Sequence, residues 1–155
     1  MTTTISSYSH RSRFGVTLIE AMIAIAILAI LVGMVAPAVS RQITHSRVND
    51  AAQVLAGQLE QAVTLAGRQR RPVRVSVDAA QKAVVLADRV SGTVISRQAY
   101  GPQSEFKLET LGSSPATVDI LPQGVATSSA TFVVGTGGYA RQVTLTRAGL
   151  VRLQP

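Results

Sequence analysis

The chain has 155 residues, a formal net charge of +7, no cysteine and two histidines. This length suits a single domain, and the lack of cysteine excludes a disulfide framework and cysteine-based metal or redox chemistry. Two histidines, His10 and His45, are too few for a histidine-rich metal site. The modest positive charge suits an anionic membrane surface or weak nucleic-acid contact, and it identifies neither.

Residues 1–15 are rich in serine and threonine, carry Arg11 and Arg13, and contain no acidic residue. We interpret them as a leader outside the fold. They precede a run of nineteen uncharged and mostly apolar residues, 21–39, which is close to the length needed to cross a bilayer. The sequence therefore predicts a transmembrane helix over residues 16–40. The two arginines before it favour a cytoplasmic N-terminal side.

Glu20 stands at the head of this apolar segment. A carboxylate at the entrance to a membrane helix is costly unless something neutralises it, which marks Glu20 as a functional residue. Two plainer interpretations leave Glu20 unexplained. One is a secretory signal peptide cleaved near Ala36-Pro37-Ala38, although the apolar run exceeds the usual length for such peptides. The other is a simple single-span anchor.

Within the apolar segment, Gly33 and Pro37 are four residues apart. Proline removes the helical hydrogen bond to the carbonyl four residues earlier, and that carbonyl belongs to a glycine. We expect a kink or an unwound turn over Gly33–Pro37. A harmless proline in a membrane helix is the alternative.

Residues 41–67 are predicted to continue as an amphipathic helix. Gly67 is the expected stop, and the arginines after it suit the negative end of a helix before Pro72 blocks its continuation. The apolar stripe that predicts the helix recurs at steps of three and four residues and consists of Val48, Ala52, Leu55, Leu59, Val63 and Ala66.

Residues 72–155 are predicted to be rich in β-strands, because apolar residues alternate with polar ones between short turns. No helix intervenes between the strands, so we expect an antiparallel sheet and, with the long helix, an α+β fold. The predicted strands are 73–77, 83–87, 93–96, 105–111, 117–121, 131–134, 142–146 and 150–153. A glycine-rich turn at Gly135–Gly138 closes the sixth of them.

One dense basic cluster is formed by Arg68, Arg70, Arg71 and Arg74. A helix-end cap with a solvated face is the plainer interpretation, and a phosphate-binding surface is the alternative. The carboxylates are scattered, and neither histidine lies beyond residue 72, so no catalytic set is recognisable. We predict that the protein is not an enzyme and needs no cofactor or metal.

The stretch Gly15-Val16-Thr17-Leu18-Ile19-Glu20 resembles the processing motif of type IV pilin-like proteins. The resemblance implies that a prepilin peptidase cuts after Gly15 and that the new N-terminus, Val16, is N-methylated, although most members carry phenylalanine there. It also implies that the Glu20 carboxylate meets the N-terminal amine of a neighbouring subunit during filament assembly. The partners would be other pilins or pseudopilins, the peptidase and the lipid of the inner membrane.

Four segments of the C-terminal third resemble the GspH/FimT family of minor pseudopilins and minor pilins, namely residues 117–124, 131–134, 143–146 and 149–152. This resemblance implies a minor pseudopilin of type II secretion, a structural subunit of the pseudopilus involved in protein export. It would be a single-pass inner-membrane protein whose domain, residues 41–155, lies in the periplasm.

The alternative within the family is a FimT-like minor type IV pilin that serves pilus assembly or DNA uptake. Some such members bind DNA through a Gly-Arg-x-Arg element, which corresponds here to Gly149-Leu150-Val151-Arg152. Leucine replaces the first arginine, so Arg152 is the one arginine kept. Together with Arg68, Arg70 and Arg71 it is a possible weak nucleic-acid contact.

Overall fold

The computed structural model describes residues 17–154, except for the side chains of residues 36 and 37. The chain forms two compact units, residues 1–39 and residues 40–155. Helix α1, Leu18–Gln69, begins in the first unit and ends in the second. In the first unit it contains every described residue but Thr17, and it is helical through Gly33–Pro37. Of the two outcomes predicted there, a kink or an unwound turn, the unwound turn is therefore not present.

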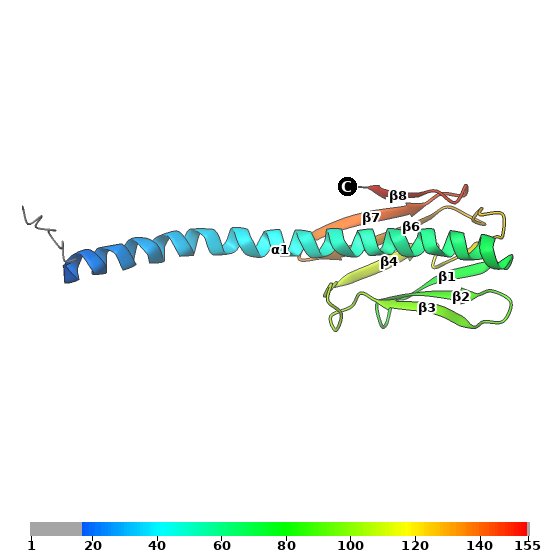
Figure 1. Ribbon diagram of the computed structural model, residues 1–155, viewed down its shortest axis with the longest axis horizontal. Coiled ribbons are helices and arrows are strands. Elements are labelled where there is room, and N and C mark those ends of the chain that lie inside the picture. The colour runs from blue at the N-terminus through cyan, green and yellow to red at the C-terminus, as the bar shows by residue number, and fades with distance from the viewer. Residues whose placement is uncertain (1–16, 155) are drawn as a thin grey trace, which may run out of the picture. The chain divides into compact units, whose positions relative to one another are not determined.

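The second unit contains all eight strands, which form two four-stranded antiparallel sheets (Figure 1). The first sheet has the order β3-β2-β1-β5, and the second has the order β4-β6-β7-β8. The strands of the first sheet are β1 (Val73–Asp78), β2 (Ala83–Asp88), β3 (Val94–Ala99) and β5 (Thr117–Ile120). Those of the second are β4 (Thr110–Ser114), β6 (Ala130–Thr136), β7 (Tyr139–Leu145) and β8 (Val151–Gln154).

The prediction of an α+β fold with antiparallel strands is confirmed, but the strands form two sheets where one was expected. The division arises because β4 pairs with β6, matching Thr110 to Gly135, whereas the next strand, β5, returns to β1 and matches Ile120 to Val73. Neither pairing joins neighbours in the sequence, so the alternation of residues could not indicate it.

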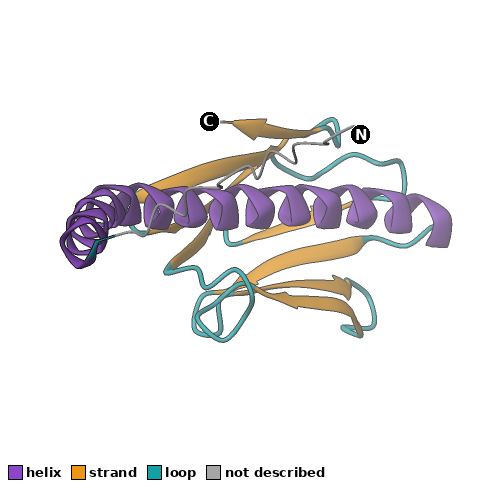
Figure 2. Cartoon of the chain, turned by 60° about the vertical axis from the view of Figure 1, so that its left-hand side comes forward, coloured by secondary structure: helices purple, strands orange, loops and turns teal. Residues whose placement is uncertain are grey.

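The core of the domain lies between α1 and the two sheets (Figure 2). The stripe predicted from sequence faces it, and Val48, Leu55 and Leu59 have no exposed surface. Both sheets contribute fully or almost fully buried side chains, such as Leu86 from β2 and Phe132 from β6. The stripe is therefore a packing surface, and burial of its side chains is the main force that holds this part of α1 on the sheets.

Residues 105–109 form a loop, although a strand was predicted over 105–111. The pattern misled because Phe106 and Leu108 alternate with charged residues and are both buried. The Phe106 ring lies against that of Tyr100, with 5.4 Å between ring centroids, and the Leu108 N–H donates to the Tyr100 carbonyl. Lys107 between them has a positive φ of 50°, which a strand does not allow.

The hairpin that joins β6 to β7 is tighter than its sequence suggests. Strand β6 continues to Thr136, which pairs with Tyr139, so only Gly137 and Gly138 form the turn. Both have positive φ, 58° and 79°, as a two-residue type I′ turn requires. Strand β7 accordingly begins at Tyr139, three residues earlier than predicted.

Helix α1 ends at Gln69, two residues beyond the predicted stop. Arg70 follows with a φ of 53°, so it occupies the left-handed position that glycine commonly takes after a helix. Gly67 lies inside the last turn instead.

Candidate functional site

The N-terminal turn of α1 carries the residue that the sequence singled out, Glu20. Thr17 precedes the helix as its cap, because its Oγ1 accepts a hydrogen bond from the Glu20 N–H at 3.2 Å. Thr17 and Glu20 have the Thr-x-x-Glu spacing of a capping box, a signal that the sequence analysis overlooked. A carboxylate in the first turn also interacts favourably with the positive end of the helix dipole. Gly15 and Val16, the predicted processing residues, lie outside the described part of the chain.

The apolar half of α1 has no partner within the described residues. From Leu18 to Val39, every large apolar side chain that the structure describes is half exposed or more, and the most apolar window has no buried residue. By length and composition this helix can cross a membrane. A continuous apolar surface of this size marks a place for lipid or for another protein.

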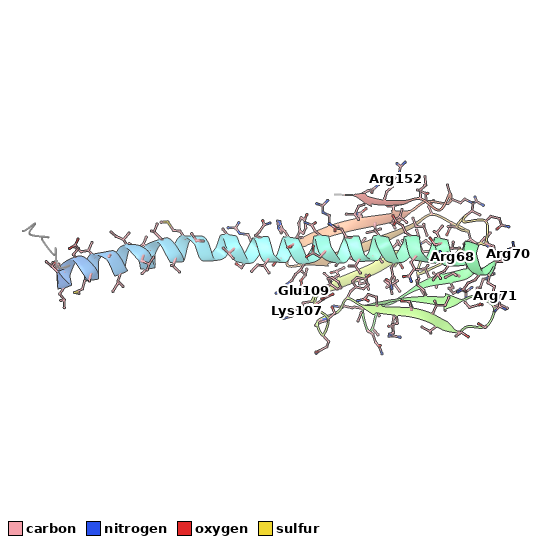
Figure 3. The ribbon with its side chains drawn as sticks, viewed as in Figure 1. Arg68, Arg70, Arg71, Lys107, Glu109 and Arg152 are labelled. Atoms are coloured by element: carbon pink, nitrogen blue, oxygen red, sulfur yellow. The ribbon has the colours of Figure 1, made fainter. Side chains whose placement is uncertain are left out.

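Three arginines of the predicted cluster, Arg68, Arg70 and Arg71, lie at the end of the domain where α1 stops and β1 starts (Figure 3). The fourth, Arg74, follows on β1. Two of them are held by aspartates. Arg74 binds both carboxylate oxygens of Asp119, at 2.7 and 3.2 Å, and Arg71 lies 3.6 Å from Asp88. Arg89, which the sequence analysis did not single out, lies 3.0 Å from the second oxygen of Asp119.

These contacts shift the acidity of the groups involved. The hydrogen bonds from Arg74 lower the pKa of Asp119, and the charges of Arg74 and Arg89 add to the effect. The pKa of Asp88 is lowered chiefly by hydrogen bonds from the backbone N–H groups of Ser91 and Val90. Both aspartates are therefore ionised at neutral pH and neutralise part of the arginine charge.

Arg68 and Arg70 are exposed and make no ion pair with any described carboxylate. Arg152 is also exposed, but it lies on β8, an edge strand of the other sheet. The structure thus brings together Arg68, Arg70 and Arg71 and leaves Arg152 on a separate sheet. Five arginines and two aspartates lie at this end of the helix and the first sheet, which gives these seven residues a net charge of +3; they are Arg68, Arg70, Arg71, Arg74, Arg89, Asp88 and Asp119.

Gly149 has a structural role in residues 149–152, the element that resembles a DNA-binding motif. Its φ is 78°, and a β-carbon built on it would lie 2.0 Å from the carbonyl oxygen of Gly124. Its N–H donates to the Thr146 carbonyl at 2.9 Å, which closes the turn between β7 and β8. Only glycine fits this close approach of two backbone segments, so its presence carries no information about DNA.

A second cluster, which no sequence pattern indicated, joins α1 to the β6–β7 hairpin. The His45 and Tyr139 rings are stacked with centroids 4.0 Å apart. Arg141 Nε donates to Asn49 Oδ1 at 2.9 Å and to the Tyr139 hydroxyl at 3.0 Å. Asn49 and its hairpin partners are 90 to 92 positions apart in the sequence, so only the folded structure shows that they are in contact. Over residues 17–154, no group of three histidine, cysteine or carboxylate side chains is placed to hold a metal ion.

Two family profiles match the sequence. A prokaryotic N-terminal methylation motif matches residues 10–36, and the family described as type II transport protein GspH matches residues 51–149, which is more than half of the chain. No curated protein matches the sequence significantly.

Three solved structures resemble the fold. Two crystal structures of the type IV minor pilin FimU from Pseudomonas aeruginosa are both 20% identical to the chain, with TM-scores of 0.59 and 0.56. They cover 72% and 69% of this chain and 90% and 92% of their own. The minor pseudopilin EpsH of the type 2 secretion system of Vibrio cholerae is 15% identical, with a TM-score of 0.48, and the match covers 70% of this chain and 96% of EpsH.

The likeness to FimU concerns the fold, a long N-terminal helix on antiparallel sheets. The two profiles account for both ends of the described architecture, since the methylation motif falls on the apolar segment and the GspH match falls on the helix and strands of the domain. The chain therefore belongs to the GspH/FimT-like family of type IV pilin-like proteins.

Proposed function

We propose that this minor pilin-like protein is a pseudopilin of a type II secretion system, a structural subunit of a short periplasmic filament that drives protein export. The observation that carries the proposal is the apolar half of α1, which has no buried residue in its most apolar stretch and a single carboxylate in its first turn. Lipid covers such a surface before assembly, and neighbouring helices of the same kind cover it in a filament. The protein acts by packing, and its family members are structural subunits.

The proposal assigns three steps to the N-terminus. A prepilin peptidase cuts after Gly15, the new amine of Val16 is methylated, and the segment over residues 16–40 anchors the protein once in the inner membrane with its domain in the periplasm. In the filament, Glu20 pairs with the Val16 amine of a neighbouring subunit. An isolated charge in an apolar environment is expensive, and pairing offsets much of this cost. Pairing also sets the axial register, because a displaced subunit would leave both charges unsatisfied.

Glu20→Ala tests this assignment, with Glu60→Ala as the matched control. Glu60 is an exposed carboxylate on the same helix, within the domain. We expect the Glu20 variant to be processed and inserted normally, and to lose most of its site-specific cross-linking to other pilins. The control variant should cross-link as the wild type does. Intact-mass measurement should give a mature protein that begins at Val16. Undiminished cross-linking, or a mature start near Val39, would overturn the assignment.

The second candidate, a FimT-like minor pilin for DNA uptake, is favoured by one observation. Arg68 and Arg70 are exposed and have no ion pair with a carboxylate of residues 17–154, and they lie beside the partly neutralised arginines. It is disfavoured by the pairing of Arg71 and Arg74 with aspartates and by the position of Arg152 on the other sheet. Genes of a secretion machine next to the coding sequence would favour the first candidate, and pilus and competence genes would favour the second.

A further inference from the structure

The arginine-rich end of the domain, where α1 stops, also carries the most exposed apolar side chains of the domain. Among the large apolar residues of the second unit, Val90, Leu150 and Val94 are the most exposed, at 79%, 57% and 56%. The two valines belong to the β2–β3 hairpin, and Leu150 follows the turn between β7 and β8. Single exposed apolar side chains are normal on a protein surface, but their concentration beside one charged cluster marks an interaction site.

Hydrogen bonds and an ion pair join these turns into one surface. Arg89, in the β2–β3 hairpin, lies 3.0 Å from Asp119 at the end of β5. The Asp119 N–H donates to the Thr127 hydroxyl at 3.3 Å, which links the first sheet to the loop that follows it. The Ala126 N–H in that loop donates to the Arg147 carbonyl at 2.9 Å, in the turn between β7 and β8. The arginine-rich end is therefore continuous across both sheets.

An open groove of about 590 Å³ crosses this end. It is lined by Leu121, Val125, Ala126, Thr127, Arg147 and Ala148. Arg147 is the one charged residue of the lining, and it is exposed and makes no ion pair with a carboxylate of residues 17–154. A mainly apolar groove with a single cation suits an apolar side chain that has a carboxylate beside it.

The hairpin turn that presents Val90 is fixed by hydrogen bonds of Asp88. The N–H groups of Val90 and Ser91 donate to Asp88 Oδ1 at 2.7 and 2.9 Å. The Gly92 N–H donates to the Asp88 carbonyl, and the Asp88 N–H donates to the Thr93 carbonyl, both at 2.9 Å. A side chain held out on such a turn loses little conformational entropy when a partner covers it. Val90 is thus a preorganised apolar contact.

The charges of the arginine-rich end are those of a protein interface that meets an acidic partner. With Arg147 added, six arginines and two aspartates lie here, a net charge of +4. Both aspartates are already bound by arginines, whereas Arg68, Arg70 and Arg147 pair with no carboxylate of residues 17–154. The two lysines of the chain lie at the opposite end of the domain, Lys82 before β2 and Lys107 before β4 (Figure 3). Interfaces are enriched in arginine and depleted of lysine.

The same end is poorly equipped for nucleic acid. Single-stranded DNA and RNA are bound by stacking their bases on aromatic rings. Of the four phenylalanines and tyrosines within residues 17–154, three are buried, and the fourth, Tyr139, lies on the β6–β7 hairpin at the opposite end. Three of the six arginines are bound by aspartates, which leaves few cations for a phosphate backbone. Exposed apolar side chains add nothing to phosphate contacts, but they are the centre of protein contacts.

We propose that the arginine-rich end docks on an acidic surface of another pilin-like subunit. Val90 inserts into the partner, the groove receives an apolar side chain from it, and Arg68, Arg70 and Arg147 pair with its carboxylates. This inference rests on the proposed function as a filament subunit. It gives the domain a contact of its own, separate from the packing of the apolar half of α1 and from the pairing of Glu20.

The experiment is site-specific photo-cross-linking of the full-length protein in its own cells. The photo-reactive amino acid benzoylphenylalanine replaces Gln69 or Gln123, which are both exposed and belong to this end but are not among the proposed contacts. The same amino acid at Ile27, on the exposed apolar half of α1, reports filament packing independently. Cross-linked partners and peptides are identified by mass spectrometry, and samples are treated with nuclease in parallel.

The charge-reversed variant Arg68→Glu with Arg70→Glu is compared with Lys107→Glu with Arg152→Glu. The control changes the net charge equally at two exposed residues that lie outside the arginine-rich end. We expect the first variant to lower the cross-linking yield from Gln123 about tenfold, and Val90→Ala to lower it about fivefold. The control should cross-link as the wild type does, and none of the variants should change the yield from Ile27. Arginine in place of the carboxylates in the partner's cross-linked peptide should restore cross-linking to the charge-reversed variant.

Absence of cross-links from Gln69 and Gln123 while Ile27 still cross-links to pilin-like subunits would overturn this proposal and leave the proposed function standing. Equal losses in the charge-reversed variant and its control would overturn it too, because only the net charge would then matter. A product that nuclease removes, or a partner outside the pilin-like proteins, would overturn the assignment of the partner. Absence of cross-links from Ile27 as well would count against the proposed function and against the inference that rests on it.

Discussion

Replacement of Gly149 by alanine is expected to destabilise the domain by far more than a change of one methyl group suggests. Two costs combine. Alanine at a φ of 78° is strained, and its β-carbon would lie 2.0 Å from the Gly124 carbonyl oxygen, closer than any real contact. Backbone strain of this kind costs about 1 kcal/mol and forced overpacking adds about 3 kcal/mol, because the obstacle is main chain that cannot rotate away.

Gly92 provides the matched control. Its φ is 72°, nearly that of Gly149, but a β-carbon on it would meet nothing within 4 Å. Gly92→Ala therefore introduces the backbone strain without the steric clash, and it should lower the free energy of unfolding by about 1 kcal/mol. For a domain of this size each kcal/mol lowers the melting temperature by about 4 °C, so we expect losses of about 16 °C for Gly149→Ala and about 4 °C for Gly92→Ala.

The assay is thermal unfolding of the full-length protein in detergent, followed by near-ultraviolet circular dichroism. The chain has no tryptophan and three tyrosines, and two of the tyrosines, Tyr100 and Tyr139, lie in the domain, so the signal reports on its packing. The membrane segment contributes no tyrosine to it. Equal losses for the two alanine variants would refute the reasoning, because they would show that the approach of Gly124 to Gly149 does not constrain the chain.

Three further predictions address the core, the acid stability and the arginine-rich end. Tyr100→Phe should lower the free energy of unfolding by about 1–2 kcal/mol, because the buried Tyr100 hydroxyl donates to Gln58 Oε1 at 3.1 Å and its loss leaves that oxygen without a donor. Adding Gln58→Leu removes the unsatisfied group and should restore much of the lost stability. Urea unfolding measures the stability of both variants. The pKa of Asp119 is lowered in the folded state, so its stabilising effect is present above the unfolded value of about 3.9 and is lost as the pH falls below it. In the Asp119→Asn variant the urea midpoint should therefore decline less steeply than in the wild type as the pH falls from about 5 to about 2. An equally steep decline in both proteins would contradict the stabilising role of the Asp119 carboxylate. The full-length protein should bind duplex DNA weakly, with a salt slope of about −2 that Arg68→Gln with Arg70→Gln abolishes, and tight binding at physiological salt would favour DNA uptake.

Local patterns determined the architecture of the chain to a large extent. The uncharged run of residues 21–39, the stripe that starts at Val48 and the alternation from Val73 onward each identify an element from neighbours a few residues apart. These signals are reliable because helix and strand periods are properties of the backbone itself. The N-terminal motif around Glu20 likewise needed no fold to be recognised, since it is a contiguous run of residues.

Only the tertiary structure decided how the elements combine. The pairing of β4 with β6 divides the strands into two sheets, and the aspartates that neutralise the arginines become neighbours only when β1, β2 and β5 lie side by side. The approach of Gly124 to Gly149 and the stack of His45 on Tyr139 have the same origin. Such contacts join residues that are distant in the chain, and their energy depends on shape and distance in three dimensions. A period of two or of 3.6 residues carries no information about either.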